Sequence, residues 1–440
     1  MRMARARRVP LMGYPDAVTY VMAARGSLHW NPYRPVGYPV LLRALHRVDR
    51  RASAVLATQH ALGIATAGLL YCTTARFARC RSVALLPAAT VLFGGSQVLL
   101  ERSMMAEAPY TFLLAGSLYC AGRSVDSAKP CAWAAASGLG LGLSSTLRSN
   151  GVLAVPILTA WTTRAIGIRA GATLALSALG VLLAYVSRAH AATGHRNLTR
   201  ANAFTLYARL APLAHAQSVP DDLAVLREDT PPEKRGNATW YMFDATSPAR
   251  RRYGELPWPL VDSPHEAYSF QGDAPLGRFA LAVLKAQPRD YLRSIAVGMV
   301  NHVRPYTGPP HAMGWDHDKL MRELSNEAFE QAAHPEMEAY FTDVDETAWA
   351  RELNAERYAR RAKLEGPPTA ALTALMLAGL VRSAERERHG ASLFAVTTLG
   401  LATLNVASLF YDVRYVTPLY GPLAAGAALG LDRILPNAAA

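Results

Sequence analysis

The feature that most constrains this chain of 440 residues is a series of long segments without charged side chains. No Asp, Glu, Lys or Arg occurs in residues 52–75, 82–100, 130–147, 170–187 or 389–411. A helix needs about 20 apolar residues to cross the ~30 Å hydrocarbon core of a bilayer, and these segments come close to that length. The sequence therefore predicts an all-α polytopic membrane protein.

Four further apolar runs are shorter or carry one acidic residue. They cover residues 103–122, interrupted by Glu107 alone, and residues 149–163, 366–381 and 415–431. With them we predict about nine spans, about six before and three after a long polar stretch. The predicted regions are an acidic external loop with juxtamembrane helices (residues 1–51), a first transmembrane bundle (52–189), an extracytoplasmic domain of mixed and irregular structure (190–365) and C-terminal transmembrane helices (366–440).

The short loops between these runs differ in their content of Lys and Arg. One alternate set is rich in them, whereas the other contains only Arg102, Arg148 and Arg414. Short cytoplasmic loops of membrane proteins carry the excess of positive charge, so the first set is predicted to lie inside. This places the multi-pass protein in the plasma membrane, with residues 190–365 and Glu107 on the outer side.

The formal net charge of +13 could indicate a nucleic-acid-binding protein. The arginines lie beside the apolar runs, however, and form no basic stripe with interleaved aromatic residues, as nucleic-acid-binding domains do. We interpret them as membrane-flanking residues. The expected partner is therefore the lipid bilayer, and no nucleic acid is expected.

Four stretches follow one another at the predicted outer ends of the helices. They are "DAVTY" with "RPVGYP", "ERSMMAEAPYTFLL", "LRSNGVLAVP" and "RYVTPLYGPLA". In these stretches the chain resembles the GT-C superfamily of membrane glycosyltransferases, which includes protein O-mannosyltransferases, the lipid A aminoarabinose transferase and many actinobacterial relatives. The chain departs from the family pattern at its start, because members usually have a spanning helix before the acidic loop.

The resemblance implies a GT-C-like helical bundle and an inverting transfer of a sugar from a polyprenyl-phosphate donor to an acceptor hydroxyl at the outer face of the membrane. A weakly basic phosphate oxygen leaves without a proton, so one carboxylate base suffices, unlike in the hydrolysis of a glycoside. Asp16 is the predicted base. Glu107 is predicted to bind a hydroxyl group or to support Asp16; the alternative is a surface carboxylate stabilised by a helix dipole.

Guanidinium groups match the geometry of the leaving phosphate. Arg148 and Arg414 are rare positive charges on the outer side, where short loops usually contain few Lys and Arg residues. Together with Arg34 they are the predicted phosphate ligands. The alternative for Arg148 and Arg414 is that they are ordinary interfacial arginines that extend to the lipid headgroups. For Arg34, the neighbouring prolines favour a role in shaping the loop. Contacts with the sugar or the acceptor are predicted for aromatic side chains at the same face: Tyr20, Tyr33, Tyr38 and Tyr415.

The polar stretch contains "HAMGWDHDK", in which His311, Asp316, His317 and Asp318 could form a cation site. Their spacing matches no established zinc pattern. Because arginine already offsets the charge of the leaving phosphate, the predicted step requires no metal and no cofactor. A divalent cation is possible but unsupported.

Two other classes of protein remain open. A transporter would use Glu107, Arg148 and Arg414 along a substrate path, but transporters often show two related halves, and the spans here divide unequally around the polar stretch. A non-enzymatic scaffold would leave the outward-facing acids and arginines without a reason.

Overall fold

The computed structural model describes residues 15–29, 33–199, 202–228, 231, 238–244, 246–253, 273–304, 314–315, 335–344, 358, 361–382, 385–409 and 411–435. Within these residues the secondary structure is helical apart from one two-residue parallel pair, β1 (Gly314–Trp315) with β2 (Tyr411–Asp412). The predicted all-α class is confirmed for the described part of the chain.

Each predicted span is helical over most of its length, and these helices form what we call the bundle. Its members are α4 (Ala52–Phe77), α5 (Leu85–Phe93), α6 (Gly95–Arg102), α7 (Glu107–Ser124), α8 (Pro130–Leu147), α9 (Ala154–Ala165), α10 (Ile168–Thr193), α20 (Pro367–Arg382), α21 (Glu385–Ser408) and α22 (Val413–Ile434). Among the described helices, three are long and apolar enough to cross a membrane, or four if the bent pair α5 and α6 is one span. A helical membrane protein is thus confirmed, whereas nine spans remain a prediction.

The run 82–100 does not form the single straight span that we predicted. The helix stops at Gly94, whose backbone is extended (φ −62°, ψ 124°), and the segments on either side of it differ in direction by 45°. The second segment, α6, is almost entirely buried and carries Gln97, Glu101 and Arg102. Side chains of this polarity are costly in lipid, so the bend turns them into the protein interior.

The bundle is held together by close helix contacts and by one central helix. Helix α7 packs between α4 and α8, α8 packs against α10, and α22 packs against both α20 and α21. Helix α22 is buried on nearly all sides, as expected for a helix that is apolar all round. On α8, a Cβ at Gly138 would lie 2.2 Å from the carbonyl oxygen of Leu174 on α10, so the small residue permits the two backbones to approach closely.

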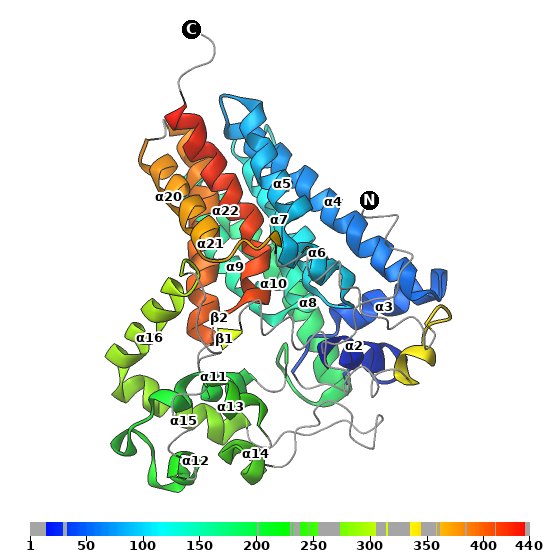
Figure 1. The fold of residues 1–440 in the computed structure, drawn as a ribbon, viewed down its shortest axis with the longest axis vertical. Helices are drawn as coiled ribbons and strands as arrows, with labels where there is room; N and C mark the ends of the chain where they lie inside the picture. The colour runs from blue at the N-terminus through cyan, green and yellow to red at the C-terminus, as the bar shows by residue number, and fades with distance from the viewer. Residues whose placement is uncertain are drawn as a thin grey trace.

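A second group of helices, which we call the lobe, lies at one end of the bundle (Figure 1). It comprises α11 (Asn202–Leu210), α12 (Val225–Glu228), α13 (Ala238–Phe243), α14 (Pro248–Tyr253), α15 (Asp273–Ala286) and α16 (Pro288–Val300). Its core is aromatic and contains Phe204, Tyr207, Trp240, Tyr241 and Phe279. The described part of residues 190–365 thus consists of short α-helices and 3-10 helices with non-helical stretches between them, together with the strand β1. That this region is an extracytoplasmic domain remains a prediction.

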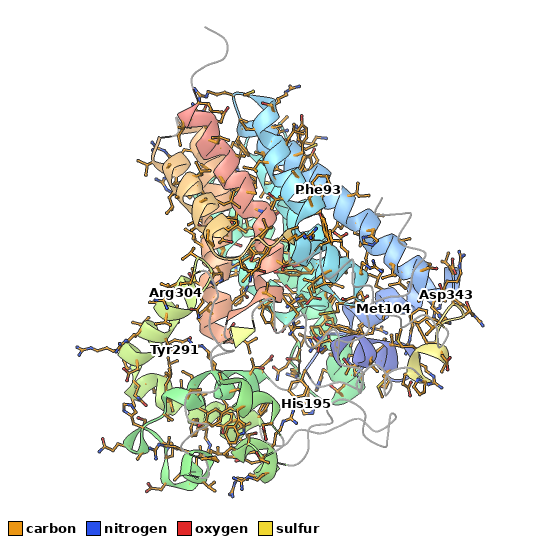
Figure 2. The ribbon with its side chains drawn as sticks, viewed as in Figure 1. Phe93, Met104, His195, Tyr291, Arg304 and Asp343 are labelled. Atoms are coloured by element: carbon orange, nitrogen blue, oxygen red, sulfur yellow. The ribbon has the colours of Figure 1, made fainter. Side chains whose placement is uncertain are left out.

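Polar contacts fix the lobe to the end of α21. The Arg209 guanidinium donates from Nε to the carbonyl oxygen of Val406 at 2.9 Å and from Nη2 to Ser294 Oγ at 2.7 Å. The hydroxyl of Tyr291, at the side of the lobe that faces the bundle (Figure 2), donates to the carbonyl oxygen of Ala407 at 2.8 Å. The bonds to Val406 and Ala407 thus join the lobe to the end of α21, and the bond to Ser294 joins α11 to α16 within the lobe.

Two short helices, α2 (Pro15–Arg25) and α3 (Gly37–Val48), lie at the same end of the bundle (Figure 1). Arg43 of α3 donates from Nε to the carbonyl oxygen of Ala24 at 2.6 Å and from Nη2 to that of Gly26, and so satisfies carbonyl groups at the end of α2. Asp343 comes from far along the chain and lies at the start of α4 (Figure 2), where its carboxylate accepts the N–H groups of Ala52 and Ser53.

A buried polar cluster links α4 to α6. The carboxylate of Glu101 accepts a hydrogen bond from Gln97 Nε2 at 2.9 Å and lies 2.8 Å from His60 Nδ1. Gln59 Nε2 donates to the carbonyl oxygens of Glu101 and Ser103, at 2.9 and 2.8 Å. These bonds hold the non-helical stretch after α6, which leads directly to Glu107 at the start of α7.

The glycine opposite this cluster generates a prediction. A Cβ at Gly63 would lie 2.0 Å from Glu101 Oε1, whereas a Cβ at Gly68 on the same helix would meet nothing within 4 Å. We expect Gly63→Ala to lower the free energy of unfolding by about 1–3 kcal/mol, because the Glu101 carboxylate is held and cannot move freely. Gly68→Ala should leave stability unchanged or raise it slightly.

Thermal unfolding of the purified protein in detergent measures both variants. Equal melting temperatures for Gly63→Ala and Gly68→Ala would contradict the proposed packing of Glu101 against α4.

Candidate active site

Five charged residues that the sequence singled out lie together at the lobe end of the bundle. Asp16 lies in the first turn of α2, and Arg34 lies in the loop before α3. Glu107 starts α7, Arg148 follows α8, and Arg414 lies in the first turn of α22. All five sit at or near helix ends on one side of the bundle, which is why segments far apart in sequence can meet there.

The five side chains form one network of ion pairs. Arg414 Nη1 lies 2.6 Å from Asp16 Oδ2 and 3.9 Å from Glu107 Oε1, so this guanidinium is shared between the two carboxylates. Arg34 Nη2 donates to Asp16 Oδ1, and Arg148 Nη1 donates to Glu107 Oε1. Both oxygens of Asp16 therefore accept from a guanidinium.

The network is buried except at Arg34, whose side chain is 23% exposed, and it carries an excess of positive charge. Asp16 is 1% exposed, Glu107 3%, Arg148 8% and Arg414 6%. Counted over the described members of the network, three guanidiniums face two carboxylates, an excess of one formal positive charge. Because a buried charge is costly without a partner, this arrangement favours the binding of an anion.

Tyrosine rings pack against the arginines. Arg148 Cζ lies 4.6 Å from the centroid of the Tyr415 ring, and Arg34 Cζ lies 5.5 Å from that of Tyr20. A cation over an aromatic ring face is stabilised by the ring quadrupole, most of all where water is excluded. The rings also restrict the arginine side chains, so that the guanidiniums are held in position before any ligand binds.

A cavity of about 360 Å³ adjoins the network. Asp16, Arg34, Arg148 and Arg414 line it together with residues of the lobe, among them Phe204. The volume is in the range of ligand pockets, about 300–1,000 Å³. The cavity thus joins a cationic wall of the bundle to the lobe.

The predicted site residues divide into those that line the cavity and those that do not. Lining residues are Asp16, Tyr20, Tyr33, Arg34, Arg148, Arg414 and Tyr415. Glu107 is absent from the lining and is packed against Arg148 and Arg414. Tyr38 is fully buried and donates to Gln59 Oε1 at 2.7 Å, so the prediction that it contacts the sugar or the acceptor is not supported by its position.

Burial decides between the alternatives for the charged residues. A surface carboxylate would be exposed, and Glu107 is not. An arginine that extends to lipid headgroups would likewise be exposed at its tip, whereas Arg148 and Arg414 are paired with carboxylates inside the protein. Both alternative readings from the sequence are therefore wrong.

Sequence reasoning missed the other polar residues of the lining, among them Asn150, Asn405 and Arg250. Asn150 Nδ2 donates to Asn405 Oδ1 at 3.2 Å, and Asn150 Oδ1 has no hydrogen-bond partner among the described residues. Such amides suit sugar hydroxyls. Asn150 stands in the quoted stretch "LRSNGVLAVP", two residues after Arg148, and this proximity was the available signal.

The possible cation site lies outside the described residues, since His311, Asp316, His317 and Asp318 belong to segments that the structure does not describe. Within the described part of the chain, no group of three or more His, Cys, Asp and Glu side chains is placed to hold a metal ion.

Comparison with known proteins gives a partial structural likeness. No protein-family model matches the sequence, and no curated protein is significantly similar to it. Among solved structures, the chain is similar to the protein O-mannosyltransferase complex of S. cerevisiae bound to the sugar donor, with 19% identity and a TM-score of 0.35. The match covers 47% of this chain and 34%, about a third, of that chain. A likeness of this extent fixes neither the reaction nor the residues that perform it.

The burial of Glu107 generates a prediction about stability. Glu107→Gln removes the charge that faces two buried guanidiniums, and loss of one partner of a buried pair typically costs about 3–5 kcal/mol. The control is Asp222→Asn, which breaks an exposed pair with Arg278 and should change stability by no more than about 1 kcal/mol. Denaturant unfolding in detergent compares the two, and an equal loss in both variants would contradict the buried network.

Proposed function

We propose that this protein is a membrane glycosyltransferase that moves a sugar from a polyprenyl-phosphate donor to an acceptor hydroxyl, with inversion, at the outer face of the membrane. One observation carries the proposal: Asp16 and three arginines line one cavity, and the arginines outnumber the carboxylates around them. A carboxylate beside an anion-binding group is what a transfer reaction with a phosphate leaving group needs.

The phosphate of the donor is placed at Arg414, with Arg148 and Arg34 on either side. A phosphodiester carries a single negative charge, which matches the excess positive charge of the network. Apolar side chains at the same wall, Leu147 and Leu153, give the lipid chain a surface to follow towards the bilayer. The amides of Asn150 and Asn405 face the sugar hydroxyls.

Asp16 acts as the base once the donor has bound. Without the donor, guanidiniums occupy both of its carboxylate oxygens, so neither oxygen is free to accept the hydroxyl of the acceptor. The donor phosphate competes for Arg414 and Arg34, which frees an oxygen of Asp16 for the acceptor. The order of binding then follows, because the acceptor can be activated only in the presence of the donor.

In the chemical step, Asp16 takes the proton of the acceptor hydroxyl while the acceptor oxygen attacks the anomeric carbon. The bond between this carbon and the phosphate oxygen breaks, and its electron pair stays on the phosphate. The leaving lipid phosphate gains one negative charge, which Arg414 and Arg148 stabilise. Attack from the face opposite the leaving group inverts the configuration.

Glu107 has a positioning role in this proposal. It lies behind the arginines and contacts both Arg148 and Arg414, so it holds them for the phosphate and limits the excess charge. The remaining alternative is a transporter, and many transporters contain a pair of broken helices, one in each of two related halves. Among the described helices, one bent pair is found, α5 with α6.

Replacement of the base tests the assignment of Asp16. We expect Asp16→Asn to lower the rate of sugar transfer by about 10²- to 10⁴-fold, because a positioned base contributes that much. Radiolabelled polyprenyl-phosphate sugars and membranes that contain the protein provide the assay. Asp49→Asn changes a carboxylate near the end of α3 and should transfer at the wild-type rate; wild-type transfer by Asp16→Asn would remove Asp16 from the mechanism.

Replacement of Arg414 tests the phosphate site. We expect Arg414→Ala to weaken use of the lipid-phosphate donor by about 10- to 100-fold, since hydrogen bonds to charged groups contribute about 1.5–3 kcal/mol. Arg414→Lys keeps the charge, and its use of the donor should be intermediate between that of the wild type and that of Arg414→Ala. Exposed Arg304 supplies the control, Arg304→Ala. An unchanged dependence of rate on donor concentration in folded Arg414→Ala protein would exclude the role.

A further inference from the structure

Helix α16 presents an exposed side that combines apolar and basic side chains. Among the described residues of the lobe, four large apolar side chains are exposed, and three of them, Leu292, Val297 and Val300, belong to this helix. The fourth, Leu281, belongs to the preceding helix α15. Exposure of large apolar side chains is thus a property of α15 and α16 and not of the lobe as a whole.

The exposed side chains of α16 follow the period of the helix. Positions three or four apart are exposed, whereas Ser294 and Gly298 between them are buried. We call the exposed set the stripe; its members are Arg289, Leu292, Arg293, Ala296, Val297 and Val300. One side of the helix is therefore packed, and the other is available for a partner.

The packed side of α16 fixes the stripe at the end of a candidate membrane span. A Cβ at Gly298 would lie 2.3 Å from Val406 Cγ1, so α16 and α21 are in close contact there. Thr403 Oγ1, one turn further into α21, donates to Met299 Sδ at 3.6 Å. Helix α21 is long and apolar enough to cross a membrane up to Ser408, and Figure 1 shows α16 beside its end, at the edge of the molecule. The stripe therefore lies where the surface of the bilayer meets α21.

The charges of the stripe suit a surface of lipid phosphates. Arg289 and Arg293 are exposed and make no hydrogen bond or ion pair with other described residues. Asp290, the one acid of α16, accepts from Gln287 Nε2 at 3.3 Å. An arginine can lay its apolar stem along neighbouring apolar side chains and extend its guanidinium to a headgroup phosphate. Basic side chains beside exposed apolar ones are typical of helices at a membrane surface.

We propose that the stripe is a membrane-docking surface of the lobe, with Leu292, Val297 and Val300 at the boundary of the acyl chains and Arg289 and Arg293 bound to the phosphates of anionic phospholipids. The continuity of the stripe with a candidate span favours the bilayer over a second copy of the chain or another protein. No residue of the stripe lines the cavity, so this surface is independent of the proposed function. The lobe is then held by lipid as well as by its hydrogen bonds to α21.

Fluorescence quenching measures whether the stripe contacts lipid. Val297→Cys is introduced into full-length protein whose four cysteines are replaced by serine, labelled with bimane and reconstituted into phosphatidylglycerol nanodiscs. We expect lipids with brominated acyl chains to quench this bimane more strongly than acrylamide does, because the label lies among acyl chains. The control is Arg252→Cys on α14, at the end of the lobe away from the bundle (Figure 1), where acrylamide should be the stronger quencher.

Two results of this measurement would overturn the proposal. Equal access of acrylamide to both labelled positions would place the stripe in water. Protection of the label at Val297→Cys from both quenchers would place it in a contact with protein, either a second copy of the chain or another partner.

Lipid binding tests the two arginines in protein that keeps its own cysteines. We expect Arg289→Gln combined with Arg293→Gln to weaken binding of labelled phosphatidylglycerol to the detergent-solubilised protein by about tenfold or more, because two basic residues near an anionic headgroup are lost. Arg252→Gln combined with Arg278→Gln removes two charges from other helices of the lobe and should bind as the wild type does. Equal binding by the two double variants would remove the arginines from the surface.

Competition identifies the lipid as the source of the phosphate. Phosphatidylcholine has no net charge, and glycerol 3-phosphate has the phosphate without the acyl chains, so neither should displace labelled phosphatidylglycerol as well as the unlabelled lipid does. Displacement by glycerol 3-phosphate as strong as that by unlabelled phosphatidylglycerol would show a site for free anions, and equal displacement by phosphatidylcholine would show no selection by charge. Either result would contradict a surface for anionic phospholipids.

Discussion

The sharing of one guanidinium, that of Arg414, between Asp16 and Glu107 is the interaction on which the candidate site depends. Asp16 and Arg414 are 398 positions apart, so their contact joins the first described helix to the last. Buried charges need partners, and here each partner comes from a different helix end. The site can therefore exist only when the bundle is assembled around it, and its charge balance is a property of the whole fold.

Support for these charges extends into the bundle. Helix α6 departs from the direction of α5 and brings Glu101 to His60 and Gln59 of α4. This cluster holds the backbone that precedes Glu107, which in turn contacts the arginines. On the other side, hydrogen bonds at the end of α21 hold the lobe over the cavity. The functional groups are thus supported by rigid elements on both sides.

Several of these features could be predicted from the sequence. Charge-free runs give the helices, and the sorting of loops by Lys and Arg content singled out Arg148 and Arg414 as exceptional. Because both stand at helix ends of the same predicted side, their meeting with Asp16 could be expected. The resemblance in short motifs drew attention to the same positions.

Other features depend on how deeply a side chain is buried in the folded protein, which the pattern of apolar and polar residues along the sequence does not show. Nothing in the sequence distinguishes the buried Arg250 from the two exposed arginines after it. Glu107 lies outside the cavity lining because its carboxylate packs against Arg148 and Arg414. The bend at Gly94 is related to the polar residues of α6. A count of apolar residues in the run 82–100 does not take these residues into account and therefore predicts a single straight span.

The carboxylate of Asp343 at the start of α4 has a consequence for biosynthesis. The first long helix of the bundle receives these two hydrogen bonds from a residue that the ribosome adds almost three hundred positions later. Until then the N-terminal end of α4 has to be satisfied by water or lipid headgroups. The cap of this helix is therefore completed only after residue 343 has been synthesised, and a nascent chain that stalls before it leaves the N-terminal end of α4 without these two hydrogen bonds.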